Sequence, residues 1–466
     1  MVKIAVFAAI VGLVASPFAA QDISVTPLSS IDTNAVGLVS PKNAGLPVNF
    51  WRDEPASEIA RLISIQNHHK IPEARAFMNR LMVTELAPPT GKHGDVAALV
   101  ARVDWLLANG ALDAADALLG KAGVQHPALF ARWFDAKLML SRNTEACEPL
   151  KLNPSLSADL PTKIYCLAQN MDWFSAELTL VSGENLGAID PERARLLAYF
   201  LEPDLMDEGP APKVQNQSDP LEFTLREALG MPRPSSGITL SQSHIDLDES
   251  AGWLAQLRAG ENLARVGAIP ARYLDALYSD NKASASGGVW ERVKAVAKLK
   301  RAMAQGDSAV ICKALNHAWD EMQKVSLLHV FSDVFAQSIA THNLSADCTE
   351  TQVNTVLLHP NFGALLFDLV EYIPEKDILR AILAMNFTDA ETNTPIETAI
   401  HGAFTSQLPI LVSPARSILK AMADTAAGTD SDPRSIQRVI ETFLAAGFET
   451  EAQRLALQYI ILDRAK

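Results

Sequence analysis

The stretch LLANGALDAADALL, residues 106–119, carries the pattern that predicts the fold. One apolar helix ends at Asn109-Gly110, and a second apolar series begins directly after it. The members of that series recur at helical spacing, at Leu112, Ala115, Leu118 and Leu119. Because glycine readily adopts the left-handed backbone that ends a helix, the stretch predicts two helices joined by a tight turn.

Four further segments repeat this order of helix end, turn residue and new apolar helix. They are CLAQNMDWFSAELTL (166–180), LARVGAIPARYLDAL (263–277), AMAQGDSAVICKAL (302–315) and FLAAGFETEAQRLAL (443–457). Glycine stands at the turn in three of them, and Asn170 replaces it in the fourth. Small residues such as Ala115 and Ala452 would let the two helices of a pair approach closely. This order is typical of tetratricopeptide-like repeats, but the full consensus is not met. Helix–turn–helix pairs without repeat ancestry therefore stay open as an alternative.

The rest of the chain supports the same fold class. No strand-like alternation interrupts the helical series between Asp95 and Phe200. Pro72 and Pro191 stand where helices are expected to begin, because proline suits the first helical turn. The sequence therefore predicts an all-α fold, an α-solenoid of stacked helical hairpins of the tetratricopeptide-like kind.

Changes in composition predict the domain boundaries. Residues 21–56 contain scattered proline and glycine without a helical period, which predicts an extended N-terminal arm. Residues 202–247 hold two Pro-rich, aperiodic stretches with a short helix expected between them at 221–229. This composition predicts a joint between an N-terminal helical-repeat half, residues 57–201, and a C-terminal half, residues 248–466.

Composition and charge exclude several classes of protein. The 466 residues are 48% hydrophobic and 20% charged, which is too apolar for a disordered chain. Forty Lys and Arg against 54 Asp and Glu give a net charge of −14. Nucleic-acid binding draws on a positive surface, so no nucleic-acid partner is expected.

The first twenty residues, MVKIAVFAAIVGLVASPFAA, predict a secretory signal peptide, residues 1–20. Lys3 precedes an apolar run that is too short for a membrane span, and small residues follow. Phe18 is an imperfect fit to a cut after Ala20, so an uncleaved N-terminal anchor is the alternative. No second apolar run is long enough to span a membrane. We expect an exported, periplasmic protein with no membrane span after cleavage.

Four cysteines agree with export: Cys147, Cys166, Cys312 and Cys348. An even number in an exported chain predicts disulfides, and four cysteines allow three pairings. Pairing by neighbourhood joins Cys147 to Cys166 and Cys312 to Cys348. Metal binding is the competing interpretation, but no CxxC spacing supports it.

Known catalytic and metal-binding motifs offer little support for an enzyme. No two histidines lie three or four residues apart, and the adjacent His68 and His69 would point in different directions on a helix. Asp248-Glu249-Ser250 contains the Glu-Ser dipeptide of lytic transglycosylases, but the motif that follows it in that family is absent. We predict no catalytic residue, no cofactor and no metal site. Core packing is expected for the aromatic residues at apolar helix positions, Trp105, Trp133, Phe134, Trp173, Trp253, Trp290 and Trp319.

As a whole, the chain resembles exported tetratricopeptide-like periplasmic proteins of alphaproteobacteria, in the manner of the MotC-type motility proteins. The resemblance lies in the succession of signal, arm, helical hairpins and Pro-rich joint. It implies a non-enzymatic scaffold or adaptor that binds another cell-envelope protein and assists the flagellar motor through its stator. A peptidoglycan-associated enzyme, or an accessory domain with a lytic-transglycosylase-like superhelix, is the alternative.

Overall fold

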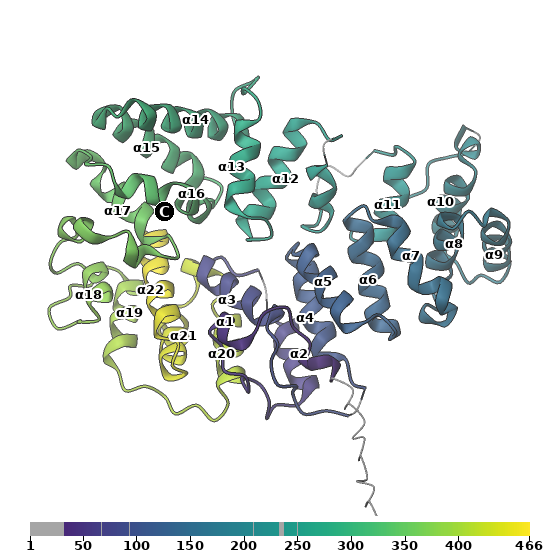
Figure 1. Cartoon of the computed structure of the whole chain (residues 1–466), viewed down its shortest axis with the longest axis horizontal. Coiled ribbons are helices and arrows are strands. Elements are labelled where there is room, and N and C mark those ends of the chain that lie inside the picture. Colours follow the sequence, from purple (N-terminus) through teal and green to yellow (C-terminus); the bar gives the residue numbers. More distant parts are fainter. Residues whose placement is uncertain (1–31, 67, 93, 208, 233–236, 249) are drawn as a thin grey trace, which may run out of the picture. The chain divides into compact units, whose positions relative to one another are not determined.

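The computed structural model describes residues 32–66, 68–92, 94–207, 209–232, 237–248 and 250–466. These residues form 22 α-helices and eight short 3₁₀ helices, with three isolated β-bridges and no strand (Figure 1). The prediction of an all-α fold is confirmed. The predicted signal peptide lies outside the described residues.

In chain order, the first eleven α-helices are α1 Pro41–Ala44, α2 Ala56–Ser64, α3 Pro72–Val83, α4 Ala97–Ala108, α5 Leu112–Ala122, α6 Pro127–Met139, α7 Asn143–Leu152, α8 Leu160–Gln169, α9 Trp173–Asn185, α10 Pro191–Leu201 and α11 Pro220–Ala228. The remaining helices are α12 Trp253–Arg265, α13 Ala271–Ser279, α14 Val289–Gln305, α15 Ser308–Gln323, α16 Leu328–Ala340, α17 Thr349–Leu357, α18 Ile378–Ala384, α19 Pro395–Thr405, α20 Pro414–Ala423, α21 Pro433–Ala445 and α22 Glu449–Arg464.

Many helices begin after an acidic or hydroxyl side chain that accepts a backbone hydrogen bond from the first turn. Asp190, Asp219 and Asp432 do so before α10, α11 and α21, and proline follows each of them directly. Proline has no N–H group to leave unpaired at this position, and the aspartate offsets the positive end of the helix dipole. The helix starts predicted at Pro72 and Pro191 are the observed starts of α3 and α10.

Glycine takes the left-handed backbone at four of the five turns of the repeated pattern. The φ angles are +71° at Gly110, +73° at Gly267, +77° at Gly306 and +83° at Gly447. In the fifth turn the left-handed residue is Met171, with φ of +63°, whereas Asn170 has φ of −88°. The prediction that Asn170 replaces glycine is therefore wrong by one residue, because Asn170 caps the end of α8 and the turn begins after it.

Helices that follow one another in sequence pack against one another from α4 to α10 and again from α12 to α17 (Figure 1). Ala115 and Ala452, expected to allow close helix packing, are both fully buried. In a linear solenoid each repeat contacts only its neighbours. Here α22 also contacts α3, and α20 contacts α2. The neighbour packing agrees with stacked hairpins, and the solenoid arrangement as a whole stays a prediction.

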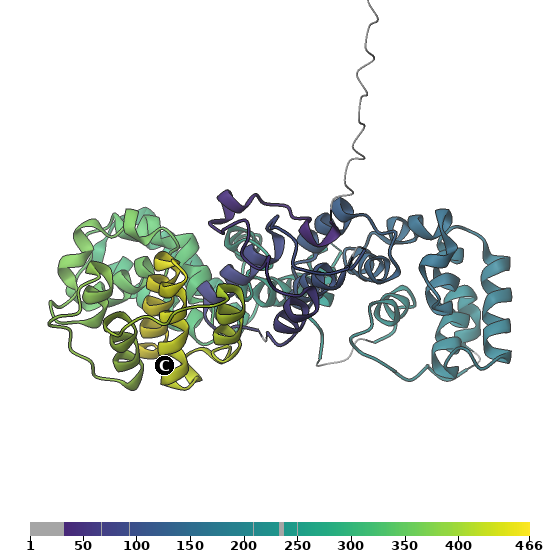
Figure 2. The same ribbon diagram turned by 90° about the horizontal axis from the view of Figure 1, so that it is seen from below.

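The first and last helices share one apolar core. Phe77 of α3 packs edge to face on Phe443 and Phe448, with ring centroids 4.9 Å and 5.5 Å apart. The Gln66 side-chain amide donates to the carbonyl oxygen of Leu419 at 2.8 Å. Both views place the purple N-terminal helices beside the yellow C-terminal ones (Figures 1 and 2). This core takes its buried residues from 36–129 and from 257–461, a grouping that differs from the predicted halves 57–201 and 248–466.

A second core draws its residues from positions 112 to 231 and includes part of the predicted joint, residues 202–247. Within that joint, α11 packs on α6 and α10 and buries Leu221 and Phe223. The proline and acidic residues around α11 mark its flanking loops. Its apolar face makes it a structural member of the second core.

Residues 32–56 also differ from the extended arm predicted over 21–56. They form a 3₁₀ helix, Thr33–Ala35, and the short helix α1, and they bury Phe50 and Trp51 in the first core. The absence of a helical period correctly indicated irregular backbone. It did not indicate that this backbone would be packed against α3 and α4.

A buried arginine makes that packing feasible. Arg102 of α4 is fully buried, and its guanidinium group donates to four backbone carbonyl oxygens. The acceptors and distances are Met82 at 2.7 Å, Asn34 at 3.2 Å, Val36 at 2.8 Å and Thr84 at 3.1 Å. Irregular backbone buried without such donors would leave unpaired polar groups, at a cost of about 1–3 kcal/mol each.

We predict that Arg102→Met lowers the free energy of unfolding by at least about 3 kcal/mol, because several buried carbonyl groups lose their donors together. Chemical denaturation followed by circular dichroism measures the change. Arg301→Met, which removes an exposed arginine of α14, is the matched control and should change stability by less than about 0.5 kcal/mol. Equal stability of the two variants would contradict the structural role of Arg102.

The disulfide pairs give a second test. The neighbouring pairs Cys147–Cys166 and Cys312–Cys348 lie at disulfide distance, with Cα atoms 5.2 Å and 5.5 Å apart. Replacing both cysteines of either pair by serine should cost about 3 kcal/mol of stability on the loop-entropy model. Peptide mapping without reductant should recover these two linked pairs. Four free thiols in protein recovered from an oxidising compartment would contradict this assignment.

Candidate functional site

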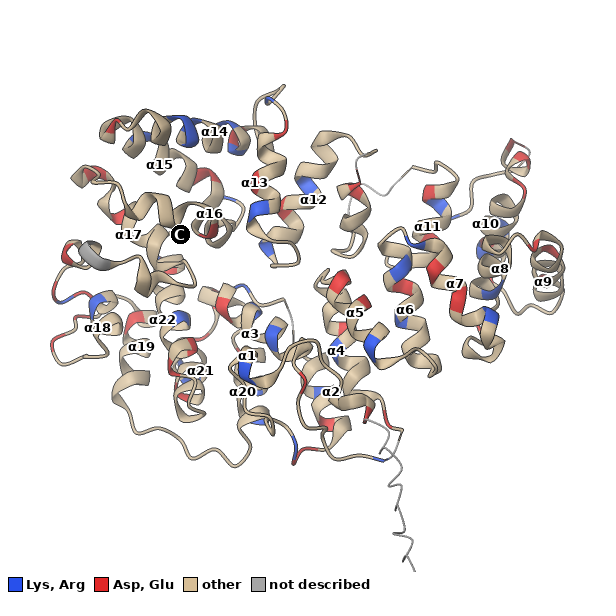
Figure 3. Cartoon of the chain, in the orientation of Figure 1, with Lys and Arg blue, Asp and Glu red and all other residues tan. Residues whose placement is uncertain are grey.

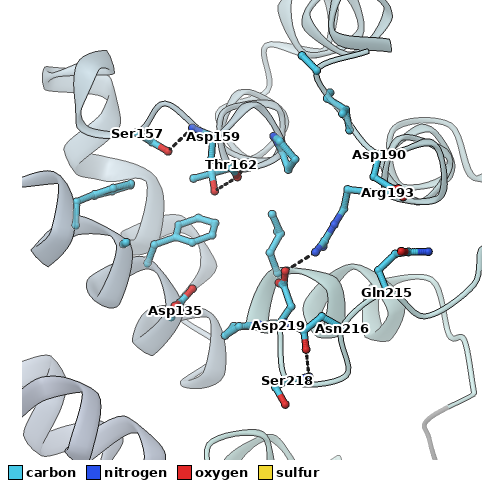
Figure 4. Close-up of a pocket in the computed structure, with 18 residues that line it drawn as sticks. Asp135, Ser157, Asp159, Thr162, Asp190, Arg193, Gln215, Asn216, Ser218 and Asp219 are labelled. Carbon is cyan, nitrogen blue, oxygen red and sulfur yellow. Dashed lines mark hydrogen bonds and ion pairs between the residues drawn. The ribbon is translucent and has the colours of Figure 1, made fainter. Parts of the chain in front are cut away.

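Three adjoining cavities form a continuous groove, which we call the central groove. The first, about 720 Å³, lies between α2 and α4. The second, about 470 Å³, lies between α4, α6 and residues 238–241, and shares His68 and Ala108 with the first. The third, about 700 Å³, shares Asp135 and Pro220 with the second and is shown in Figure 4. Because each cavity shares lining residues with the next, we describe the three together as one groove.

The third cavity is built from the beginnings of three helices, which face α6 (Figure 4). Asp159, Asp190 and Asp219 cap α8, α10 and α11, and all three line this cavity. The cap bonds to backbone N–H groups measure 2.9 Å to Thr162, 2.9 Å to Glu192 and 2.9 Å to Glu222. Each carboxylate offsets the positive end of its own helix dipole. The three acidic side chains also line the cavity, where a ligand can contact them.

Acidic side chains outnumber basic ones along the central groove. Its charged lining residues are Asp104, Asp135, Asp159, Asp190, Asp219, Arg61 and Arg193. Arg61 binds Glu58 at 2.8 Å, Arg193 pairs with Asp219, and Arg132 pairs with Asp104 at 2.8 Å. Asp135, Asp159 and Asp190 are the lining carboxylates that have no ion pair with a described residue. The groove therefore carries a net negative charge that suits a cationic ligand.

Asp135 stands where the second and third cavities meet. Its carboxyl group has no hydrogen bond or ion pair with any described residue. Burial raises the pKa of Asp135 to about 7, and the negative charge of Asp219 adds to the shift. Arg132 opposes the shift, while Asp104 and Asp159 reinforce it. A cationic group placed beside Asp135 would favour its ionised form and would itself gain a partner.

Hydrogen bonds to α4 hold the wall of the second cavity in place. The Ser241 hydroxyl donates to the carbonyl oxygen of Leu107 at 2.5 Å, and His244 Nε2 lies 2.5 Å from the carbonyl oxygen of Gly110. On the opposite side, His68 Nδ1 lies 2.9 Å from Asn109 Oδ1. The predicted joint thus supplies part of the groove wall.

The structure separates the residues that the sequence singled out. Cys147 and Cys166 join α7 to α8, and Cys312 and Cys348 join α15 to the start of α17, all away from the groove. His68 lines the groove, whereas His69 is buried and bonds to Gln66. Glu249 lies outside the described residues.

The aromatic residues follow the core prediction with one exception. Trp105, Phe134 and Trp319 are buried, and Trp133, Trp253 and Trp290 pack against the core while partly exposed. Trp173 is 45% exposed and lies outside both cores. The sequence indicates this exposure, because α9 has more large apolar residues than one buried stripe of a helix can hold. They are Trp173, Phe174, Leu178 and Val181.

Sequence reasoning did not find the aspartates of the groove. Asp190 and Asp219 are recognisable as helix caps because proline follows them, but nothing local shows that the caps share one cavity. Asp135 carries a stronger signal, since it interrupts the apolar run around Phe134 and Leu138. A single acidic residue in such a run indicates a carboxyl group that is at least partly buried, which is uncommon for an aspartate.

In comparisons with known proteins, no family model, no curated protein and no solved structure matches the chain. None of the helices in the described ranges is both long and apolar enough to cross a membrane. Over the same ranges, no group of three or more His, Cys, Asp or Glu side chains is placed to hold a metal ion.

We predict that Asp135→Asn stabilises the protein at pH 8.5 but not at pH 4. The folded state holds the Asp135 proton up to about pH 7, whereas the unfolded chain releases it near pH 4. Stability from this group is therefore complete at low pH and is lost as the pH rises to about 7. The variant avoids that loss, and we expect a gain of about 2 kcal/mol at pH 8.5 because part of the carboxyl group remains solvated.

Urea denaturation at the two pH values measures this difference. Asp53→Asn, a change at an exposed carboxyl group, is the control and should alter stability by less than about 0.5 kcal/mol at both. An Asp135→Asn variant whose stability change is the same at pH 4 and pH 8.5 would contradict the environment described for Asp135.

Proposed function

We propose that the protein is a non-enzymatic periplasmic scaffold or adaptor that binds another cell-envelope protein through an extended segment in the central groove. The acidic, continuous groove is the observation that carries the proposal. The resemblance to MotC-type motility proteins makes a component of the flagellar stator the first partner to test.

The dimensions of the groove favour a chain-like ligand. Sites for small molecules usually occupy about 300–1,000 Å³. Each of the three cavities reaches that size, and together they would leave a small ligand in contact with only part of the lining. An extended peptide advances about 3.3 Å per residue and can place successive side chains in successive cavities. Stacked helical hairpins commonly present extended surfaces of this kind to peptides.

The charges favour a segment that contains lysine or arginine. Asp135 lacks a partner among the described residues, and Asp159 and Asp190 hold backbone and hydroxyl groups of their own helices. A cationic side chain would pair with these carboxylates without displacing an existing ion pair. Such complementarity accelerates association and selects against acidic partners.

The predicted signal peptide and the cysteine pairs support the periplasmic part of the proposal. The predicted signal peptide leads the chain to an oxidising compartment, and two cysteine pairs lie at disulfide distance. Disulfides persist in such compartments and are rare in the cytosol. The cell envelope is therefore where the partner is to be sought.

Site-specific photo-crosslinking in living cells tests the proposal. A photo-reactive residue replaces Ala131, an exposed residue of the third cavity, or Ala304 on α14 as the matched control. We expect position 131, and not position 304, to capture a segment of an envelope protein that is rich in Lys and Arg. Asp135→Asn together with Asp190→Asn should reduce the capture about tenfold or more, because asparagine still caps α10 but carries no charge.

Two outcomes would contradict the proposal. One is the absence of any protein adduct specific to position 131. The other is capture of peptidoglycan fragments there, together with their release from purified peptidoglycan by the protein, which would favour the enzymatic alternative.

A further inference from the structure

Helix α9 carries an apolar face that no described residue covers. Its exposed side chains are Trp173, Phe174, Leu178 and Val181, with exposed fractions of 45%, 76%, 57% and 47%. Phe174, Leu178 and Val181 lie at positions i, i+4 and i+7 and form one stripe along the helix. Soluble surfaces carry single exposed apolar side chains routinely, but a contiguous stripe marks an interaction site.

The opposite face of α9 is firmly packed. Ala176, Leu180 and Gly183 are buried against the neighbouring helices. A Cβ atom on Gly183 would lie 2.6 Å from Ile189 Cδ1, so a larger residue there would require the Ile189 side chain to move. Beneath α9, α8 is joined to α7 by the Cys147–Cys166 pair. The apolar stripe is therefore held outward by a well-fixed layer of helices.

Glutamates border the stripe on one side. A shallow cavity of about 320 Å³ runs between α9, α10 and the 3₁₀ helix Pro203–Asp207. Glu177, Glu184 and Glu202 line it, and none of their side chains has a hydrogen-bond or ion-pair partner among the described residues. Helix α9 contains no lysine or arginine, and Figure 3 shows it without blue residues.

We infer that the α9 face docks an amphipathic helix of a partner protein, with an apolar stripe bordered by lysine or arginine. Side chains at i, i+4 and i+7 on α9 form a ridge that a second helix can accept between its own side chains. Basic residues at the edge of that helix would pair with Glu177, Glu184 and Glu202. The 13 residues of α9 extend about 20 Å, enough for three turns of the partner.

The charges argue against two other occupants. Anionic membrane surfaces attract lysine and arginine and repel carboxylates, so the glutamates make a lipid surface a poor match. A second copy of the chain docking through the same face would bring the glutamates of both copies together, and like charges disfavour that arrangement. A basic amphipathic helix satisfies both the apolar and the acidic parts of the surface.

This surface is separate from the central groove and would act beside it. Its residues come from α9, α10 and the 3₁₀ helix Pro203–Asp207, and none of them lines the three cavities of the groove. A scaffold with two such surfaces can hold two segments of one partner, or two partners, at the same time.

Fluorescence anisotropy with synthetic helical peptides tests the inference. The probe is a labelled 18-residue peptide with Leu and Phe on one stripe and Lys along both edges. Two matched peptides carry Glu in place of Lys, or the same residues in scrambled order. We expect the Lys-edged peptide to bind at least about tenfold more tightly than either of the others.

Variants of the exposed residues locate the binding site. Phe174→Ser with Leu178→Ser should weaken binding about tenfold or more, since aromatic and aliphatic anchors dominate such interfaces. Glu177→Lys with Glu184→Lys should reverse the preference, so that the Glu-edged peptide binds more tightly. Binding that Asp135→Asn with Asp190→Asn weakens, and that Phe174→Ser with Leu178→Ser leaves unchanged, would place the peptide in the central groove and overturn the inference, which separates this result from the test of the groove. Thermal melts confirm that the variants fold, as expected for changes at exposed positions.

Several results would overturn the inference. Equal binding of all three peptides, or no binding of any, would show that the α9 face does not recognise a basic amphipathic helix. A preference that the charge reversal leaves unchanged would place the peptide elsewhere. Binding to phosphatidylglycerol vesicles that Phe174→Ser with Leu178→Ser abolishes would assign the face to membranes. A wild-type dimer in sedimentation that becomes monomeric in the same variant would assign it to a second copy.

Discussion

The hydrogen bonds from Arg102 to four backbone carbonyl groups are the interaction on which the rest of the structure depends. Its guanidinium group joins α4 to the irregular residues 34–36 and to the end of α3. Burial lowers the pKa of Arg102 to about 10, so the group remains charged at neutral pH. A hydrogen bond from a charged donor to a carbonyl oxygen is stronger than one from a neutral donor. With α4 fixed in this way, one wall of the central groove is fixed as well.

The return of the last helices to the first ones sets this protein apart from a simple linear array. Contacts of α22 with α3 and of α20 with α2 place both ends of the described chain in one core. The helices from α6 to α11 build a second core, which contains the third cavity at its edge and carries α9 on its surface. The first core thus carries the α2–α4 part of the central groove, while the second carries the third cavity and the α9 face.

Local sequence patterns predict the elements of this structure well and their assembly poorly. Gly110 and Gly447 mark turns because a left-handed backbone favours glycine, and apolar residues spaced three and four apart mark the helices. The pairing of Cys147 with Cys166 follows from neighbouring helices. In contrast, the contact of Phe77 with Phe443 joins residues far apart in sequence, and no periodic pattern encodes it. The same holds for Asp135, Asp159 and Asp219, which meet in one cavity because of how three helices, α6, α8 and α11, pack.

An acidic groove and an apolar face bordered by glutamates together support our proposal of an adaptor with basic partners. Asp135 is the group of the groove that is most sensitive to pH near neutrality, because burial raises its pKa to about 7. Calorimetric titration with the segment captured by photo-crosslinking at position 131 tests the proposal most directly. We predict about tenfold tighter binding at pH 8 than at pH 6, and no such difference in Asp135→Asn. Equal affinity of the wild-type protein at both pH values, with no loss in Asp135→Asn, would contradict it.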